Sequence, residues 1–165
     1  MSTSAIQETI NQWQSEPEKA IMKPIVKGRS EGVQAVIEAG PFSWRMDVPP
    51  VFGGTNEAPS PAALLLGSLA GCAALFIKDT LAPQYGVAVE AVEATVSCTA
   101  DGRGALGMAE SIPDFQDMAI TIQIKSTENS EKVKQVYDAW LERCPVYLAL
   151  IKSLKVATTL KINSS

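Results

Sequence analysis

Residues 60–77 read SPAALLLGSLAGCAALFI and form the most apolar segment of the chain. Ser60 is a good helix N-cap, and Pro61 suits the first helical position because its missing N–H has no partner there. The pattern predicts a helix from Pro61 to about Leu81 that is apolar on nearly every side. We expect this helix to be buried on most sides. A domain of this size cannot easily do that alone, so a dimer that encloses the helix is favoured.

The same segment lies at the lower edge of the length that spans a bilayer, about 17–25 residues. Two glycines and a serine interrupt it, and no second segment of this kind exists. The N-terminus, MSTSAIQETINQW, has neither a basic start nor an apolar stretch of the signal-peptide type. We therefore expect a soluble, cytoplasmic protein that does not act at a membrane.

The composition suits one domain with a sizeable core, since the chain has 165 residues and 46% of them are apolar. The net charge is -4 and no run of Lys or Arg occurs, so a nucleic acid is a poor candidate partner. The sequence contains no histidine, which excludes Ser-His-Asp and Cys-His catalysis and removes most zinc sites. A phosphate-binding loop, a dinucleotide fingerprint and a CxxC motif are also missing, so we expect no cofactor and no metal.

Helical and strand patterns alternate along the chain in an α+β order. The first helix is expected to begin at a capping box, and the strands show the period of two that half-buried strands have. Helices are expected over 4–17, 61–81, 131–142 and from Pro145, and strands within 21–48, 92–99, 118–125 and 156–162. We divide the chain into an N-terminal helical extension, residues 1–19, and a single domain, residues 20–165.

Three cysteines, Cys72, Cys98 and Cys144, are the candidate reactive side chains. An odd number in a chain without an export signal argues against a disulfide framework and favours reduced thiols. Cys144 precedes Pro145, which places it at or next to a helix N-cap, where the helix dipole favours a thiolate. Arg143 adds positive charge nearby, although an ordinary cysteine in a helical turn fits the same pattern. Cys72 and Cys98 have the settings of buried core cysteines.

Two motifs resemble the OsmC/Ohr family. Residues 54–72 read GTNEAPSPAALLLGSLAGC, and residues 144–147 read CPVY. Family members have a Pro-containing loop, a helix beginning P-x-x-L-L, a cysteine after a run of small residues, and a later Cys-Pro that opens a helix. The resemblance covers residues 20–162. It implies an OsmC-like α+β fold, with antiparallel sheets packed around a long buried central helix in an intertwined homodimer.

The resemblance implies a thiol-dependent peroxidase that reduces organic hydroperoxides in oxidative stress defence. Cys72 would attack the hydroperoxide and become a sulfenic acid, and Cys144 would condense with it to a disulfide. A small dithiol or a lipoyl-type reductant would then restore both thiols.

An arginine on the first strand holds the thiolate in this family, and Arg29 matches that position, with Arg45 as a weaker alternative. Arginine always carries its charge and can lower a thiol pKa directly. In the family a glutamate ten residues before the first cysteine usually pairs with this arginine, but here that position is Ala62. Glu57 in the preceding loop is the candidate replacement. Otherwise the arginine is freer than usual, or the chemistry differs.

Two other functions stay open at this point. Because the family glutamate is absent, an apolar cavity around Cys72 could bind a hydrophobic small molecule, with the cysteine only as lining. The cysteine pair could also sense redox conditions or exchange disulfides with a partner protein.

Overall fold

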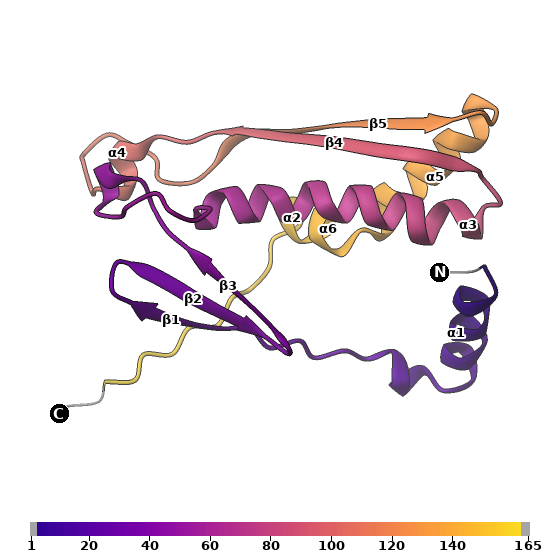
Figure 1. Cartoon of the computed structure of the whole chain (residues 1–165), viewed down its shortest axis with the longest axis horizontal. Coiled ribbons are helices and arrows are strands. Elements are labelled where there is room, and N and C mark those ends of the chain that lie inside the picture. The colour runs from indigo at the N-terminus through magenta and orange to yellow at the C-terminus, as the bar shows by residue number, and fades with distance from the viewer. Residues whose placement is uncertain (1–2, 163–165) are drawn as a thin grey trace.

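The computed structural model describes residues 3–162 and has two antiparallel sheets beside a long central helix (Figure 1). The predicted α+β class is confirmed. In chain order the elements are α1 (Thr3–Ser15), η1 (Pro17–Ala20), β1 (Lys27–Glu31), β2 (Gln34–Ala39), β3 (Phe42–Met46), η2 (Pro50–Phe52), α2 (Pro61–Leu75), η3 (Phe76–Leu81), α3 (Ala82–Gln84), β4 (Val89–Thr99), α4 (Gly102–Ala105), β5 (Gln116–Ser126), α5 (Ser130–Arg143) and α6 (Pro145–Ile151).

α2, the π-helical segment η3 and α3 form one continuous helix from Pro61 to Gln84. It begins where the sequence predicts, because the Ser60 side chain accepts a hydrogen bond from the Ala63 N–H. Within the described residues it is the single helix long and apolar enough to cross a membrane. Core helices of soluble proteins meet the same two criteria, so this is weak evidence for a membrane span.

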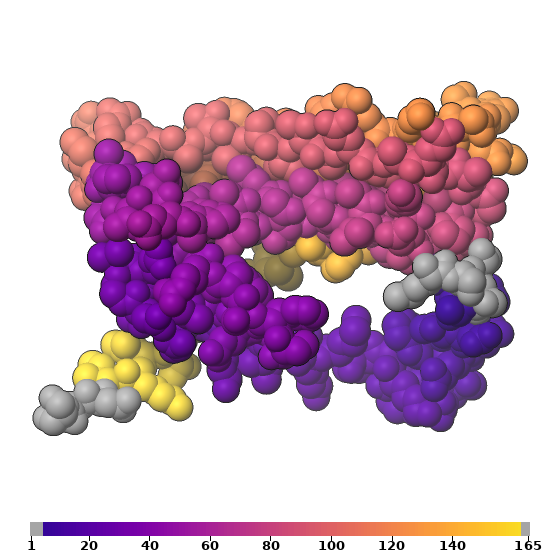
Figure 2. Space-filling view, in the orientation of Figure 1, coloured from indigo at the N-terminus to yellow at the C-terminus, as the bar shows by residue number. Residues whose placement is uncertain are grey.

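The chain covers only one side of this central helix. Apolar residues of that side, among them Ala73 and Ile77, join the core, whereas Leu75 is 65% exposed. Only 17% of the most apolar window of the helix is buried. One chain alone therefore does not enclose the helix, as expected for a domain of this size. The three-stranded sheet makes no extensive contact with the helix, and Figure 2 shows open space between the helix and the N-terminal part of the chain.

The covered side packs against the long hairpin of β4 and β5. Apolar residues alternate along both strands and face the helix, as their period of two predicts. These residues are Val92, Ala94, Val96, Ile120, Ile122 and Ile124. α5 adds Val136, Ala139 and Trp140, all buried, to the same core.

The second sheet is the antiparallel meander β1-β2-β3. Its register aligns Arg29 with Val36 and Val36 with Arg45, so these three side chains share one face. The opposite face carries Ile37 and Trp44, which also lie opposite each other. Trp44 is 37% exposed although it is a large apolar residue. The sheet therefore presents both a charged face and an apolar face that its own chain leaves largely open.

A buried carboxylate shapes the loop that connects β3 to α2. Asp47 accepts hydrogen bonds from the Thr55 hydroxyl and from the backbone N–H groups of Val48, Thr55 and Glu57. The Thr55 hydroxyl bond, with the backbone donors behind it, holds the pKa of Asp47 far below its usual range. Gly54 passes so close that a Cβ there would overlap the Val48 carbonyl and the Asp47 carboxylate. This loop therefore fixes where α2 begins.

The C-terminal segment differs from the expectation. A strand was predicted over residues 156–162, but the segment is extended and pairs with no strand among the described residues. It runs away from the helices (Figure 1), and Val156, Leu160 and Ile162 are exposed. The prediction is wrong for a single chain because the alternation of side chains needs a neighbouring strand to pair with.

Candidate functional site

Two cysteines that are distant in sequence meet at the middle of the central helix. Cys72 lies on α2 and Cys144 lies between α5 and α6, and their Sγ atoms are 2.7 Å apart. Both are free thiols. A disulfide bond is about 2.05 Å long, so a movement of well under an ångström would bring the two sulfur atoms to bonding distance.

The packing around Cys144 fixes its side chain. Cys144 is the N-cap of α6, Pro145 follows at the first helical position as predicted, and the Sγ atom accepts a hydrogen bond from the Tyr147 N–H at 3.4 Å. The residue is fully buried. The rings of Trp140 and Tyr147, whose centroids are 5.0 Å apart, pack in the same core. Cys144 is therefore preorganised, and solvent does not reach it.

The neighbouring Cys72 is only partly buried. Burial raises the pKa of the Cys72 thiol from 9.0 to about 11, and the contact with Cys144 acts in the same direction. A backbone N–H bond from Val146 acts the other way and lowers the pKa. In a single chain Cys72 is thus a neutral thiol at physiological pH, and it needs a nearby cation to become a nucleophile.

Arg143 does not supply that cation, although it is adjacent to Cys144 in sequence. Its Nη2 atom donates a hydrogen bond to the Tyr85 hydroxyl at 3.0 Å, and its guanidinium lies 5.8 Å from the centroid of the Tyr85 ring. The side chain therefore binds the end of the central helix near α3 instead of the thiols.

Arg29 and Glu57 bind other partners than the thiol pair. No hydrogen bond or ion pair joins either residue to Cys72 among residues 5–162. Glu57 accepts only a long bond, 3.5 Å, from the Gln34 amide, and its backbone N–H serves Asp47. The geometry thus brings together two of the four predicted site residues, and the roles of Arg29 and Glu57 stay predictions.

Sequence reasoning missed the acidic partner of the arginines, which is Glu31. Arg29 Nη1 donates to Glu31 Oε2 at 2.5 Å, and Arg45 Nη2 donates to Glu31 Oε1 at 2.6 Å. The hydrogen bond from Arg29 lowers the pKa of Glu31 most, and the hydrogen bond from Arg45 adds to this effect. The same bond to Glu31 raises the pKa of Arg29. A signal was present, because residues two apart on a strand share a face. The Arg45 contact needs the register of the sheet.

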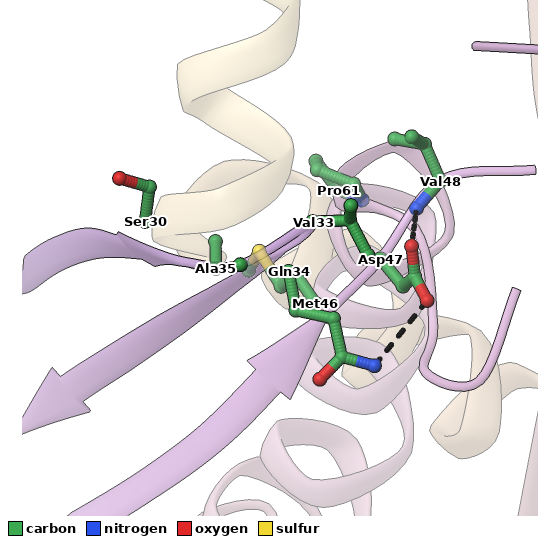
Figure 3. Close-up of a pocket in the computed structure, with 9 residues that line it drawn as sticks. Ser30, Val33, Gln34, Ala35, Met46, Asp47, Val48 and Pro61 are labelled. Atoms are coloured by element: carbon green, nitrogen blue, oxygen red, sulfur yellow. Dashed lines mark hydrogen bonds between the residues drawn. The ribbon is translucent and has the colours of Figure 1, made fainter. Parts of the chain in front are cut away.

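Three cavities lie near these groups, and one of them, about 370 Å³, is lined by Lys27, Gly28, Arg29, Val36 and Glu38 on the three-stranded sheet. An apolar cavity of about 130 Å³ is lined by Leu69, one helical turn before Cys72, and by Tyr147, whose N–H binds Cys144, although neither cysteine lines it. The other lining residues are Met118, Ala119, Ile120, Leu150 and Ile151. A third cavity, about 240 Å³, lies where the three-stranded sheet meets the start of α2 (Figure 3). Among residues 3–162 no group of three or more His, Cys, Asp or Glu side chains could hold a metal ion.

The chain matches the family model described as OsmC-like protein over residues 54–159. No curated protein matches it significantly. Among solved structures, an OsmC-like protein from Mycoplasma pneumoniae has a TM-score of 0.65 and 18% identity, covering 79% of this chain and 88% of its own. An organic hydroperoxide resistance protein OsmC from Legionella pneumophila has a TM-score of 0.55 and 19% identity, covering 79% of this chain and 90% of its own. A candidate organic hydroperoxide resistance protein from Vibrio cholerae, with captopril bound in one of its active sites, has a TM-score of 0.55 and 21% identity, covering 79% and 85%.

Proposed function

Because the chain belongs to the OsmC-like family, we propose that it is a thiol-dependent peroxidase that reduces organic hydroperoxides. The observation that carries the proposal is the 2.7 Å separation of the Cys72 and Cys144 sulfur atoms. Two proteins of similar fold, from L. pneumophila and V. cholerae, are named for organic hydroperoxide resistance.

The proposed cycle begins at Cys72. The Cys72 thiol loses its proton, and the thiolate attacks one oxygen of the hydroperoxide, so that the O–O bond breaks. The leaving alkoxide takes up a proton in place of the one that the thiol released, which yields the Cys72 sulfenic acid and an alcohol. The Cys144 thiol then attacks the sulfenic sulfur, so that a disulfide forms and water leaves. A small dithiol or lipoyl-type reductant restores both thiols by two exchange steps and becomes a disulfide itself.

Burial supports this assignment of roles. Cys144 is fully buried, whereas Cys72 is partly exposed and has the apolar cavity one helical turn away. A peroxide can therefore approach Cys72 more easily than Cys144. The cavity of about 130 Å³ suits a small apolar group, because an engineered cavity of about 150 Å³ holds benzene.

Thiolate formation requires a positive charge that one chain does not place beside Cys72. We propose that two copies form a homodimer and that the second copy supplies Arg29. The exposed side of the central helix around Leu75, the apolar face around Trp44 and the unpaired C-terminal segment give such a dimer surfaces to bury. The cytoplasm, where thiol reductants are maintained, is the proposed location; neither nucleic acid nor membrane has a part in the cycle.

The test is consumption of cumene hydroperoxide with dithiothreitol or dihydrolipoamide as reductant. Cys72→Ser should lower turnover at least about a thousandfold, because it removes the nucleophile. Cys144→Ser should accumulate the Cys72 sulfenic acid, which dimedone traps. Cys98→Ser is the matched control and should keep wild-type turnover. Wild-type turnover in Cys72→Ser would refute the peroxidase mechanism.

The apolar cavity also favours a second candidate, the binding of a hydrophobic small molecule without turnover. Its volume of about 130 Å³ is below the roughly 300–1,000 Å³ of drug-sized ligand sites, so the ligand would be small. Native mass spectrometry of freshly purified protein should then show a retained ligand, and protein that is always empty would contradict this function.

A further inference from the structure

The carboxylate of Glu31 holds two guanidinium groups, one on each oxygen. Arg29 binds Oε2 at 2.5 Å and Arg45 binds Oε1 at 2.6 Å. All three side chains share the charged face of the β1-β2-β3 sheet, where the two arginines flank Val36. Val36 is buried between them, and the ion pairs with Glu31 are the contacts that orient the two guanidinium groups.

The contacts continue from Arg45 to the loop that starts the central helix. Arg45 Nη1 donates to Gln34 Oε1 at 3.1 Å, and Gln34 Nε2 donates to Asp47 Oδ2 at 3.3 Å (Figure 3). Asp47 is buried and fixed by the loop backbone. Arg29 is therefore connected, through Glu31, Arg45 and Gln34, to a rigid part of the chain.

We propose that Glu31 positions Arg29 for activation of the thiol and so takes the place of the glutamate that the family has where this chain has Ala62. This inference rests on the proposed function. Glu57, the earlier candidate, reaches only the Gln34 amide and not Arg29. Glu31 is a positioning residue, because it acts on the peroxide site through Arg29.

The ion pair between Arg29 and Glu31 should affect the rate of the reaction more than the stability of the fold. Arg29, Glu31 and Arg45 are each about half exposed in a single chain, and exposed ion pairs contribute little to stability. A misplacement of about 1 Å in a positioning group, by contrast, can cost about a hundredfold in rate. Loss of the Glu31 carboxylate should therefore lower the rate and leave the melting temperature unchanged.

The experiment compares Glu31→Gln with Glu38→Gln. Glu38 is on the same face of the sheet, and its charge raises the pKa of Arg29 less than Glu31 does. The two variants thus remove the same charge, but only Glu31→Gln replaces one of the two oxygens that accept from the arginines by an NH₂ donor. Three quantities are measured: kcat and KM for cumene hydroperoxide, the melting temperature, and the alkylation rate of Cys72 by iodoacetamide against pH in a Cys144→Ser background.

Glu31→Gln should lower kcat/KM at least about tenfold and move the alkylation profile of Cys72 to higher pH, while Glu38→Gln changes neither. Glu31→Asp should show an intermediate loss. Adding Ala62→Glu to Glu31→Gln should restore part of the rate, since it returns a carboxylate to the family position.

Equal behaviour of Glu31→Gln and Glu38→Gln, or a faster Glu31→Gln, would overturn the inference. Arg29→Gln distinguishes this failure from failure of the proposed function. If Arg29→Gln shifts the Cys72 profile and Glu31→Gln does not, only the role of Glu31 is wrong. If Arg29→Gln leaves the Cys72 profile unchanged as well, Arg29 does not activate the thiol, and the activation step of the proposed function fails with the inference.

Discussion

The part of the molecule that holds the thiols is packed around a core, whereas the three-stranded sheet that holds Arg29 buries Val36 but leaves other large side chains partly exposed. In the part that holds the thiols, Cys144 and Trp140 are completely buried. On the three-stranded sheet, Arg29 and Trp44 remain partly exposed. One chain therefore brings the two thiols together, whereas the cation that we propose for activation of Cys72 lies on the exposed sheet. Both thiols belong to one packed core, whereas the charge of Arg29, which we propose activates Cys72, lies on an exposed surface that a second copy would cover.

The largest expected effect contrasts a tryptophan from each part. Trp140→Ala should lower the free energy of unfolding by about 3–5 kcal/mol, because it empties a buried site. Trp44→Ala should cost clearly less, about 1–2 kcal/mol in a single chain, since Trp44 already leaves 37% of its surface exposed. Urea denaturation at low protein concentration measures both values.

The same pair tests whether a second copy covers the sheet. If it does, the cost of Trp44→Ala should grow as the protein concentration rises, while the cost of Trp140→Ala stays constant. If both variants lose the same free energy of unfolding at low concentration, the three-stranded sheet is already packed within one chain. The sheet and the core around Trp140 would then not differ in packing.

A charge on the open side of the central helix should weaken self-association. Leu75 is exposed in one chain, so Leu75→Glu should fold normally but bind a second copy at least about a hundredfold more weakly, since charges are strongly disfavoured in the core of an interface. Sedimentation velocity measures the association, and Leu75→Met is the control of similar volume. Peroxide turnover should fall together with dimer content. A Leu75→Glu variant that stays dimeric would place the interface elsewhere.

Much of the packed part could be predicted from the sequence, because its signals are local. Ser60 and Pro61 define the start of the central helix, and Cys144 with Pro145 defines the start of α6. The meeting of the two cysteines is not a local signal; it came from the resemblance to a family. The contact between Glu31 and Arg45 could not be predicted, because it depends on the register of the strands. The strand over residues 156–162 was wrongly predicted, because alternating side chains do not show whether a neighbouring strand is available for pairing.

A substitution in the loop between β3 and α2 should lower the stability by an intermediate amount. Asp47 accepts five hydrogen bonds, from Gln34, Val48, Glu57 and twice from Thr55, and Asp47→Asn puts an NH₂ donor where one of these acceptor oxygens stands. The melting temperature at pH 7 should fall by about 5 °C or more. Because the pKa of Asp47 is lowered in the folded state, its stabilisation is present above the unfolded value, about 3.9, and is lost as the pH falls through the folded value.

Calorimetry from pH 7 down to pH 2 measures this dependence. The difference in melting temperature between wild type and Asp47→Asn should shrink as the pH falls below about 4. Gly54→Ala, which would overlap the same carboxylate, should be destabilising at every pH. A constant difference across the range would mean that the charge of Asp47 has no part in holding the loop.

The smallest effect concerns the pH dependence of stability caused by Cys72. Its pKa is raised from 9.0 to about 11 in a single chain, so the stabilisation is complete below pH 9 and is lost as the pH rises toward 11. Because Cys72 is only partly buried, solvent screening reduces the effect, and the melting temperature of wild type should fall by about 1–3 °C more than that of Cys72→Ser over this range. At concentrations where a second copy binds, Arg29 should lower the pKa instead. The pH dependence of the difference in melting temperature would then reverse, with wild type gaining stability over Cys72→Ser as the pH rises toward 9. Calorimetry at two protein concentrations therefore shows whether a second copy brings Arg29 to Cys72.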